Sequence, residues 1–214
     1  MKYSQIRNLL GFCIGAVLTT GCAGLKVPYP AKSYYLVDPG AAVIPSTTHT
    51  PSPAVNGTLK VRQIRIASPF NGDSFIYKVG PNQYASDYYD AFLMPTDRML
   101  TSGLTCWLGE SGLFTHVVDA ESSVRAGYAL EGSVSKFMID ATDPHKHQAV
   151  VDAQFFLLHN TEAGPEILFS KSYTISAPVK SDGHAAEVEA WNEACQSILV
   201  GLTSDINQKL TREE

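Results

Sequence analysis

Three segments in the second half of the chain alternate apolar and polar residues, which is typical of strands with one buried face. The first of them changes parity after Val134, and a bulge near Ser135 would return its apolar residues to one face. We therefore expect an antiparallel meander joined by polar loops. The three strands cover residues 128–139, 149–157 and 167–175, and the loops cover 140–148 and 160–165.

Two other segments repeat apolar residues at every third or fourth position, which predicts amphipathic helices. The first begins at Pro95 with Thr96 and ends at Gly112. The second runs from about Ala185 to Leu210. The predicted buried faces are Met99, Leu100, Leu104, Trp107 and Leu108 in the first helix, and Val188, Trp191, Ala194, Cys195, Ile198, Leu202 and Ile206 in the second.

Shorter apolar segments predict further strands in the first half. Gly80, Pro81 and Asn82 separate two of them, which is a hairpin signal. Another changes parity near Gln63, where we expect a bulge. The order of strands, helix, strands and helix predicts an α+β fold, an antiparallel or mixed β-sheet with two main α-helices packed on one face. These strands cover residues 33–37, 59–66, 75–79, 83–85 and 114–118.

Residues 38–57 combine four prolines and two glycines with many serines and threonines, which is typical of a loop. We expect this loop to be mobile and to be available for docking a partner.

The chain begins with the pattern of a secretory signal. Lys2 and Arg7 precede an apolar run at 9–18, and small residues lead to Cys22. The run is shorter than the ~20 apolar residues that span a bilayer, so a transmembrane anchor is not expected.

The small residues ending in Cys22 resemble the processing site of bacterial lipoproteins, where the thiol is acylated and the signal is removed before the cysteine. Thr19 stands where the usual pattern has Leu. We predict that Cys22 carries lipid, including palmitate; the alternative is cleavage after Ala23, which would leave a soluble periplasmic protein. In such lipoproteins an Asp after the cysteine favours the inner membrane, so Ala23 points to the outer membrane, facing the periplasm.

The expected organisation is therefore a signal peptide at 1–21, a tether at 22–32 and a single α+β domain at 33–210.

Composition excludes some classes of protein. The 214 residues are 44% hydrophobic and 17% charged, so disorder throughout is excluded. The net charge of −5 lacks the basic footprint of nucleic-acid binding. Four cysteines do not make a disulfide scaffold. Helical phase places Cys195 in the core and Cys106 on the flank of its helix, so we expect both to be free thiols.

No motif points to catalysis or to a cofactor. His145 and His147 lie in a polar turn without further ligands at zinc spacing, and we interpret them as solvated. The chain has neither a Gly-x-Ser-x-Gly elbow nor a phosphate-binding loop. We expect no enzyme activity, no metal and no cofactor.

An aromatic cluster is the main unusual feature of the sequence: Tyr84, Tyr88, Tyr89 and Phe92. Core packing is the favoured interpretation, because large aromatic side chains are mostly buried. The alternative is a surface that contacts a partner or lipid.

Several segments together resemble one family over about residues 12–208. They are Ser33-Tyr34-Tyr35-Leu36-Val37-Asp38-Pro39 after the cysteine, Phe75-Ile76-Tyr77 with the aromatic cluster and Pro95, Ser111-Gly112-Leu113-Phe114, Tyr128-Ala129-Leu130-Glu131-Gly132-Ser133-Val134, and the last helix with Ala190-Trp191 and Ala194-Cys195. They resemble the auxiliary lipoprotein component of ABC-type transport systems, a family that includes the PqiC lipoproteins. The Trp that is often found near Tyr88 and Phe92 is absent.

The resemblance implies a non-enzymatic role at the outer membrane. Such lipoproteins accompany MCE-domain proteins, whose tunnels carry phospholipids or other hydrophobic molecules across the periplasm. The chain would dock the tunnel to the outer membrane and support membrane integrity. Its implied partners are the MCE-domain protein and the permease of the same system, with homo-oligomers left open. The alternative is a structural or regulatory outer-membrane lipoprotein of envelope biogenesis.

Overall fold

The computed structural model describes residues 31–40 and 55–212. The predicted signal peptide, Cys22 and most of the tether lie outside these residues, as does most of the predicted loop at 38–57. All elements below belong to the unit that begins at Lys32.

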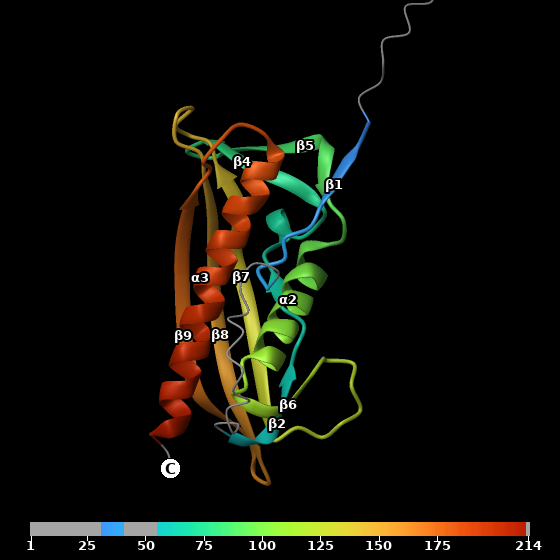
Figure 1. Cartoon of the computed structure of the whole chain (residues 1–214), viewed down its shortest axis with the longest axis vertical. Helices are drawn as coiled ribbons and strands as arrows, with labels where there is room; N and C mark the ends of the chain where they lie inside the picture. Colours follow the sequence, from blue (N-terminus) through green and yellow to red (C-terminus); the bar gives the residue numbers. More distant parts are fainter. Residues whose placement is uncertain (1–30, 41–54, 213–214) are drawn as a thin grey trace, which may run out of the picture. The chain divides into compact units, whose positions relative to one another are not determined.

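A long antiparallel meander forms one side of the sheet, as the alternation predicts (Figure 1). It consists of β7 (Tyr128–Asp140), β8 (Gln148–Thr161) and β9 (Gly164–Pro178). The register of β7 against β8 shifts between Val134 and Lys136, which confirms the bulge near Ser135. The bulge returns Phe137 and Ile139 to the core side.

The other edge of β7 pairs with three short strands in succession along its length. They are β2 (Val55–Val61), β3 (Arg65–Ile66) and β4 (Ser74–Gly80), all parallel to β7. A parallel partner β6 (Phe114–Val118) follows outside β2. Outside β4 come the antiparallel β5 (Gln83–Phe92) and then β1 (Ser33–Tyr35), which is parallel to β5. The nine strands make a mixed sheet, and with two helices they give the predicted α+β fold.

The strand predicted at 59–66 is divided into β2 and β3. Val61 pairs with Leu130 and Arg65 with Ser133, so one additional residue lies between them, which confirms the bulge near Gln63. The backbone N–H of Ile64 donates to Oγ1 of Thr101 on a helix, at 3.0 Å, instead of to β7. This detour explains the parity change, since it carries Ile64 into the core at 4% exposed.

Two helices cover one face of the sheet, α2 (Thr96–Glu110) and α3 (His184–Thr211) (Figure 1). α3 packs over β8 and β9, while α2 packs over β2, β3 and β6. The indole N–H of Trp107 on α2 donates to Oγ1 of Thr203 on α3, at 2.9 Å. The predicted buried face of α3 is confirmed at all seven positions. A short 3-10 turn, η1 (Ser68–Phe70), completes the elements.

Aromatic rings join α3 to the sheet. Trp191 is fully buried and stacks on Phe137 of β7, with ring centroids 5.4 Å apart and planes 9° apart. The rings of Phe75 and Phe92 contact the same indole at 5.0 and 5.2 Å. These contacts make β4, β5, β7 and α3 one core.

Some predicted boundaries change. β1 ends at Tyr35 rather than residue 37, although Val37 is still buried and its N–H donates to Sδ of Met99. Residues 55–57 belong to β2 instead of the predicted loop. Cys195 is buried as predicted, Cys106 is exposed on α2, and both are free thiols. Among the described residues, no helix is long and apolar enough to cross a membrane.

Candidate functional site

A bulge of several residues interrupts β5 in the middle of the aromatic cluster. Ile76 of β4 faces Ser86, but Ser74, two residues earlier, faces Ala91. The additional β5 residues therefore leave the ladder. Oδ1 of Asp87 accepts hydrogen bonds from the backbone N–H groups of Tyr89 and Asp90, at 2.7 and 2.8 Å. Asp87 thus stabilises the bulge from within, as Asp side chains do in turns.

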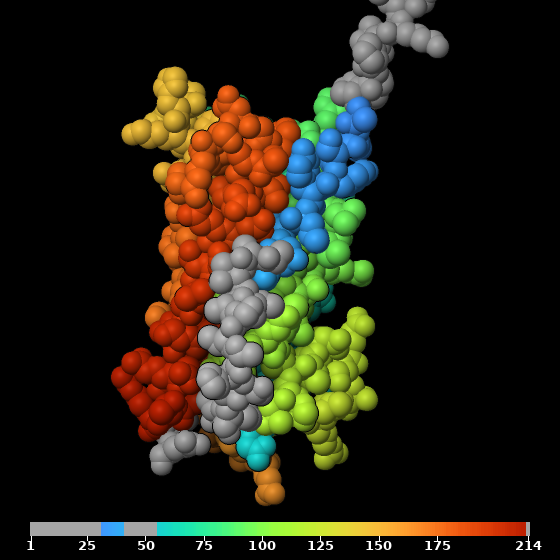
Figure 2. Space-filling view, in the orientation of Figure 1, coloured from blue at the N-terminus to red at the C-terminus, as the bar shows by residue number. Residues whose placement is uncertain are grey.

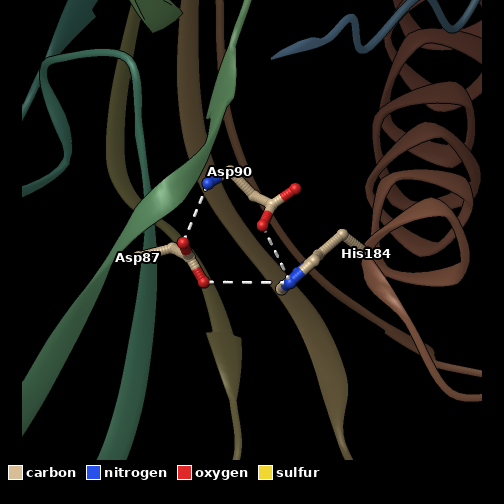
Figure 3. Close-up of side chains that lie close together, drawn as sticks. All are labelled: Asp87, Asp90 and His184. Carbon is tan, nitrogen blue, oxygen red and sulfur yellow. Dashed lines mark hydrogen bonds and ion pairs between the residues drawn. The ribbon is translucent and has the colours of Figure 1, made fainter. Parts of the chain in front are cut away.

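The bulge turns two carboxylates toward the first residue of α3 (Figure 3). Nε2 of His184 lies 3.3 Å from Oδ2 of Asp90 and 3.8 Å from Oδ2 of Asp87. On the other side of the ring, Nδ1 lies 2.9 Å from Oε2 of Glu187. The hydroxyl of Tyr77 on β4 donates to the same Glu187 oxygen at 2.8 Å. These five residues, which we call the His184 cluster, connect β4, β5 and α3.

The electrostatics of the cluster favour a charged imidazole. Burial lowers the pKa of His184, but the hydrogen bond with Glu187 and the charges of Glu187, Asp90 and Asp87 outweigh it, so the pKa is raised above 6.5. Burial and the bond to Glu187 also raise the pKa of Tyr77, whose hydroxyl stays a donor. Since both ring nitrogens face carboxylates, the protonated ring can donate on both sides.

Three residues of the cluster could also hold a divalent cation. Ligand atoms of Asp87, Asp90 and His184 lie within 4.8 Å of one another, and in the described part of the chain they are the only such group of three. Glu187 on Nδ1 would orient the imidazole from the outer shell, as carboxylates do behind metal-bound histidines.

Beside the cluster, the paired ends of β1 and β5 expose apolar side chains. Tyr34 faces Ala91 in the register and points away from the core, whereas Tyr35 and Phe92 point into it. The exposed fractions of Tyr34 and of Leu93, the residue after Phe92, are 58% and 62%. Leu36 and Tyr88 are also exposed. Tyr34, Leu36, Tyr88 and Leu93 are called the β1–β5 face below. The segment 31–40, blue in Figure 2, is visible at the surface, although Val37 within it is buried.

The structure divides the predicted aromatic cluster into separate environments. Phe92 is 2% exposed and belongs to the core, which agrees with the favoured interpretation and excludes the alternative of a surface contact for this residue. Tyr88 is 67% exposed and packs edge-on against the half-buried Tyr89, so core packing is wrong for Tyr88. Tyr84 is 52% exposed and contacts Phe70 at the hairpin end of β5. The four predicted aromatic residues therefore do not form one continuous surface.

The predicted polar turn lies near the same end of the fold. His145 and His147 occupy the β7–β8 loop, and with His184 and Glu187 they line an open cleft of about 490 Å³. Neither of the two belongs to the group that could hold a metal.

Sequence reasoning missed His184 and three members of the β1–β5 face. The sequence carries a signal for two of them, because Tyr34 and Leu36 alternate with the partly buried Tyr35 and the buried Val37, so the segment is apolar on both faces. It carries none for the contact of His184 with Asp87 and Asp90, because these partners come from a distant strand.

Comparison with solved structures identifies the fold. A protein of Xanthomonas campestris assigned to the family DUF330 superposes with a TM-score of 0.68 at 18% identity, over 86% of this chain and 96% of that one. An uncharacterized protein gives 0.62 at 16% identity, over 82% and 99%. A hypothetical protein of Chlamydia trachomatis gives 0.52 at 5% identity, over 73% and 98%. At such identities the likeness concerns the fold alone.

No curated protein is significantly similar to the chain in sequence. The match to a family model is therefore the finding that classifies the chain. That model describes the ABC-type transport auxiliary lipoprotein component and covers residues 40–201, so the chain belongs to this family of transport auxiliary lipoproteins.

Proposed function

We propose that the chain is a periplasm-facing lipoprotein of the outer membrane that docks the tunnel of an MCE-type transport system to that membrane and so supports membrane integrity. The observation that carries the proposal is the family match over residues 40–201, because it assigns the chain to auxiliary components of ABC-type transport. In this proposal the partners are the MCE-domain protein and the permease of the same system.

The anchor in this proposal is Cys22. Acyl chains on its thiol and on its new amine would hold the protein to the membrane, since each buried CH₂ contributes ~0.8 kcal/mol. Ala23 in place of Asp supports the outer membrane as the destination. The signal peptide at 1–21 would be removed, and residues 23–31 would connect the anchor to the folded unit.

The apolar cavity between the two helices and the sheet does not by itself indicate carriage of a lipid. An apolar cavity between α2 and α3 has a volume of about 40 Å³. A water molecule needs ~10–15 Å³ of such space, so this cavity is small beside a whole lipid molecule. A role as a structural component also agrees with a family of transport auxiliary proteins that is not known for catalysis.

Affinity capture from cross-linked envelopes tests the proposal. We expect the tagged chain to recover an MCE-domain protein and its permease. The matched control is a strain without the MCE gene, where the permease should no longer be recovered. Capture of peptidoglycan enzymes alone would contradict the proposal and would favour a role in envelope biogenesis.

A further inference from the structure

The β1–β5 face is an apolar surface that the fold itself does not use. Tyr34, Leu36, Tyr88 and Leu93 are four of the nine large hydrophobic side chains that are exposed among the described residues. Scattered apolar residues on a surface need no explanation, but neighbouring ones mark contact sites. Here Tyr34 lies on β1 and Tyr88 in the bulge of β5, while Leu36 and Leu93 directly follow these two paired strands.

Register explains why these side chains cannot enter the core. Tyr35 and Phe92 are paired and point inward, toward Phe75. Because side chains alternate along a strand, the neighbours Tyr34 and Leu93 must point outward. The inward positions are already filled with aromatic rings, so the strand pair is apolar on both faces and only one face is buried.

The chemistry of the face suits the boundary between lipid and water. The ammonium group of Lys32 lies 5.0 Å from the centre of the Tyr88 ring, so a cation accompanies the exposed aromatic groups. Tyrosine concentrates at membrane interfaces because its ring is apolar and its hydroxyl is polar, and lysine extends its charge toward the head groups. The carboxylates of Asp87 and Asp90 turn to His184, which keeps them paired beside an anionic membrane.

The position of the face along the chain identifies the surface that it meets. Lys32 follows Cys22 by ten residues, which span at most ~36 Å when fully extended. β1 is therefore the first described element after the proposed anchor, and the tether keeps the membrane within that distance of it. A short tether of this kind raises the effective concentration of the face at the lipid surface, so weak contacts suffice for binding.

We infer that the β1–β5 face rests on the lipid surface that holds the Cys22 acyl chains, with Tyr34 and Tyr88 at the depth of the head groups and with Leu36 and Leu93 against the acyl boundary. This inference rests on the lipid anchor of the proposed function. It also defines how the domain is oriented on the membrane. If β1 and β5 contact the lipid, the same side of the domain always faces the transport tunnel.

Quenching by brominated lipid tests the contact. The processed lipoprotein is reconstituted in vesicles of phosphatidylethanolamine and phosphatidylglycerol, with Tyr34→Trp or Tyr88→Trp. Tyr84→Trp is the matched control, an exposed tyrosine at the hairpin end of β5. Emission of the unsubstituted protein, from Trp107 and Trp191, is subtracted.

We expect brominated chains to quench Tyr34→Trp and Tyr88→Trp at least about two-fold more strongly than the control, since interfacial groups lie ~5–10 Å into the boundary. Equal quenching of all three variants would overturn the inference. These vesicles contain no transport partner, so the quenching tests only the contact with lipid. The affinity capture from envelopes tests only the proposed function, and either experiment can fail without the other.

A pair of charge substitutions gives a second measurement. Leu93→Glu in the Tyr88→Trp background should lower the quenching, because burial of a carboxylate at the boundary is costly. Ile167→Glu is the matched control, since Ile167 on β9 is 63% exposed against 62% for Leu93. Thermal unfolding verifies that both variants fold. An equal effect of the two substitutions would also overturn the inference.

Discussion

Nε2 of His184 lies 3.3 Å from Oδ2 of Asp90, and this contact joins the first turn of the last helix to the bulge of β5 (Figure 3). Glu187 holds the opposite nitrogen of the same ring. The side chain of His184 therefore fixes both the helix start and the strand segment that exposes Tyr88.

We expect this contact to make stability depend on pH. The pKa of His184 in the folded protein is raised above 6.5, so the stabilising charge is fully present below pH 6.5 and is lost as the pH rises through the folded value. The groups that face the ring are Asp87 and Asp90 of β5, Glu187 of α3 and Tyr77 of β4.

His184→Ala should lower the free energy of unfolding by about 1–2 kcal/mol at pH 6, since bonds to charged groups contribute ~1.5–3 kcal/mol and solvent weakens them here. The difference from the unsubstituted protein should shrink by pH 9. His145→Ala, on the exposed β7–β8 loop, is the control and should change stability by less than ~0.5 kcal/mol. Urea unfolding at several pH values measures both. A difference that stays constant with pH would show that the ring does not titrate in this window.

Gly132 marks a point where two strands leave no room for a side chain. A Cβ atom there would lie 2.9 Å from Cε1 of Phe155, its buried partner on β8. Gly132→Ala should therefore destabilise the fold by about 1–3 kcal/mol through overpacking.

The matched control for Gly132 is Gly109→Ala. Gly109 lies on the exposed side of α2, where an added Cβ has nothing within 4 Å. Because alanine favours helix, this variant should be more stable by up to ~1 kcal/mol. Thermal unfolding measures both variants. A change of melting temperature in the same direction for both substitutions would contradict the proposed packing.

The two cysteines of the folded unit should react very differently. Burial raises the pKa of Cys195 to about 12, and the side chain is enclosed by α3 and the sheet. Cys106 is exposed on α2. In the processed, acylated protein we expect one thiol to react under native conditions and two after denaturation without reductant. No reactive thiol after denaturation would reveal a disulfide instead.

Cys22→Ser tests the anchor directly. We expect the variant to lose metabolic labelling with palmitate and to remain unprocessed or soluble, because serine supplies no thiol for acylation. Cys106→Ser is the control and should label like the unsubstituted protein. Equal labelling of the Cys22 variant would disprove the lipid anchor.

The local pattern of the sequence is enough to predict most elements. The buried face of α3 and the strands of the meander follow from periodicity, which depends only on neighbouring residues. The bulge at Ser135 was readable for the same reason, since one extra residue must shift the parity of all that follow. The Cys22 anchor also comes from sequence and stays a prediction.

The tertiary structure decided how distant segments meet. Periodicity does not tell which strands pair, so it could not predict that β2, β3 and β4 would line up along one edge of β7. Nor could it place Asp87 and Asp90 beside His184, because the bulge that turns them forms only where β5 meets the shorter β4. The sequence marks Tyr34 and Tyr88 as apolar; only the filled core on the other side of β1 and β5 leaves them exposed.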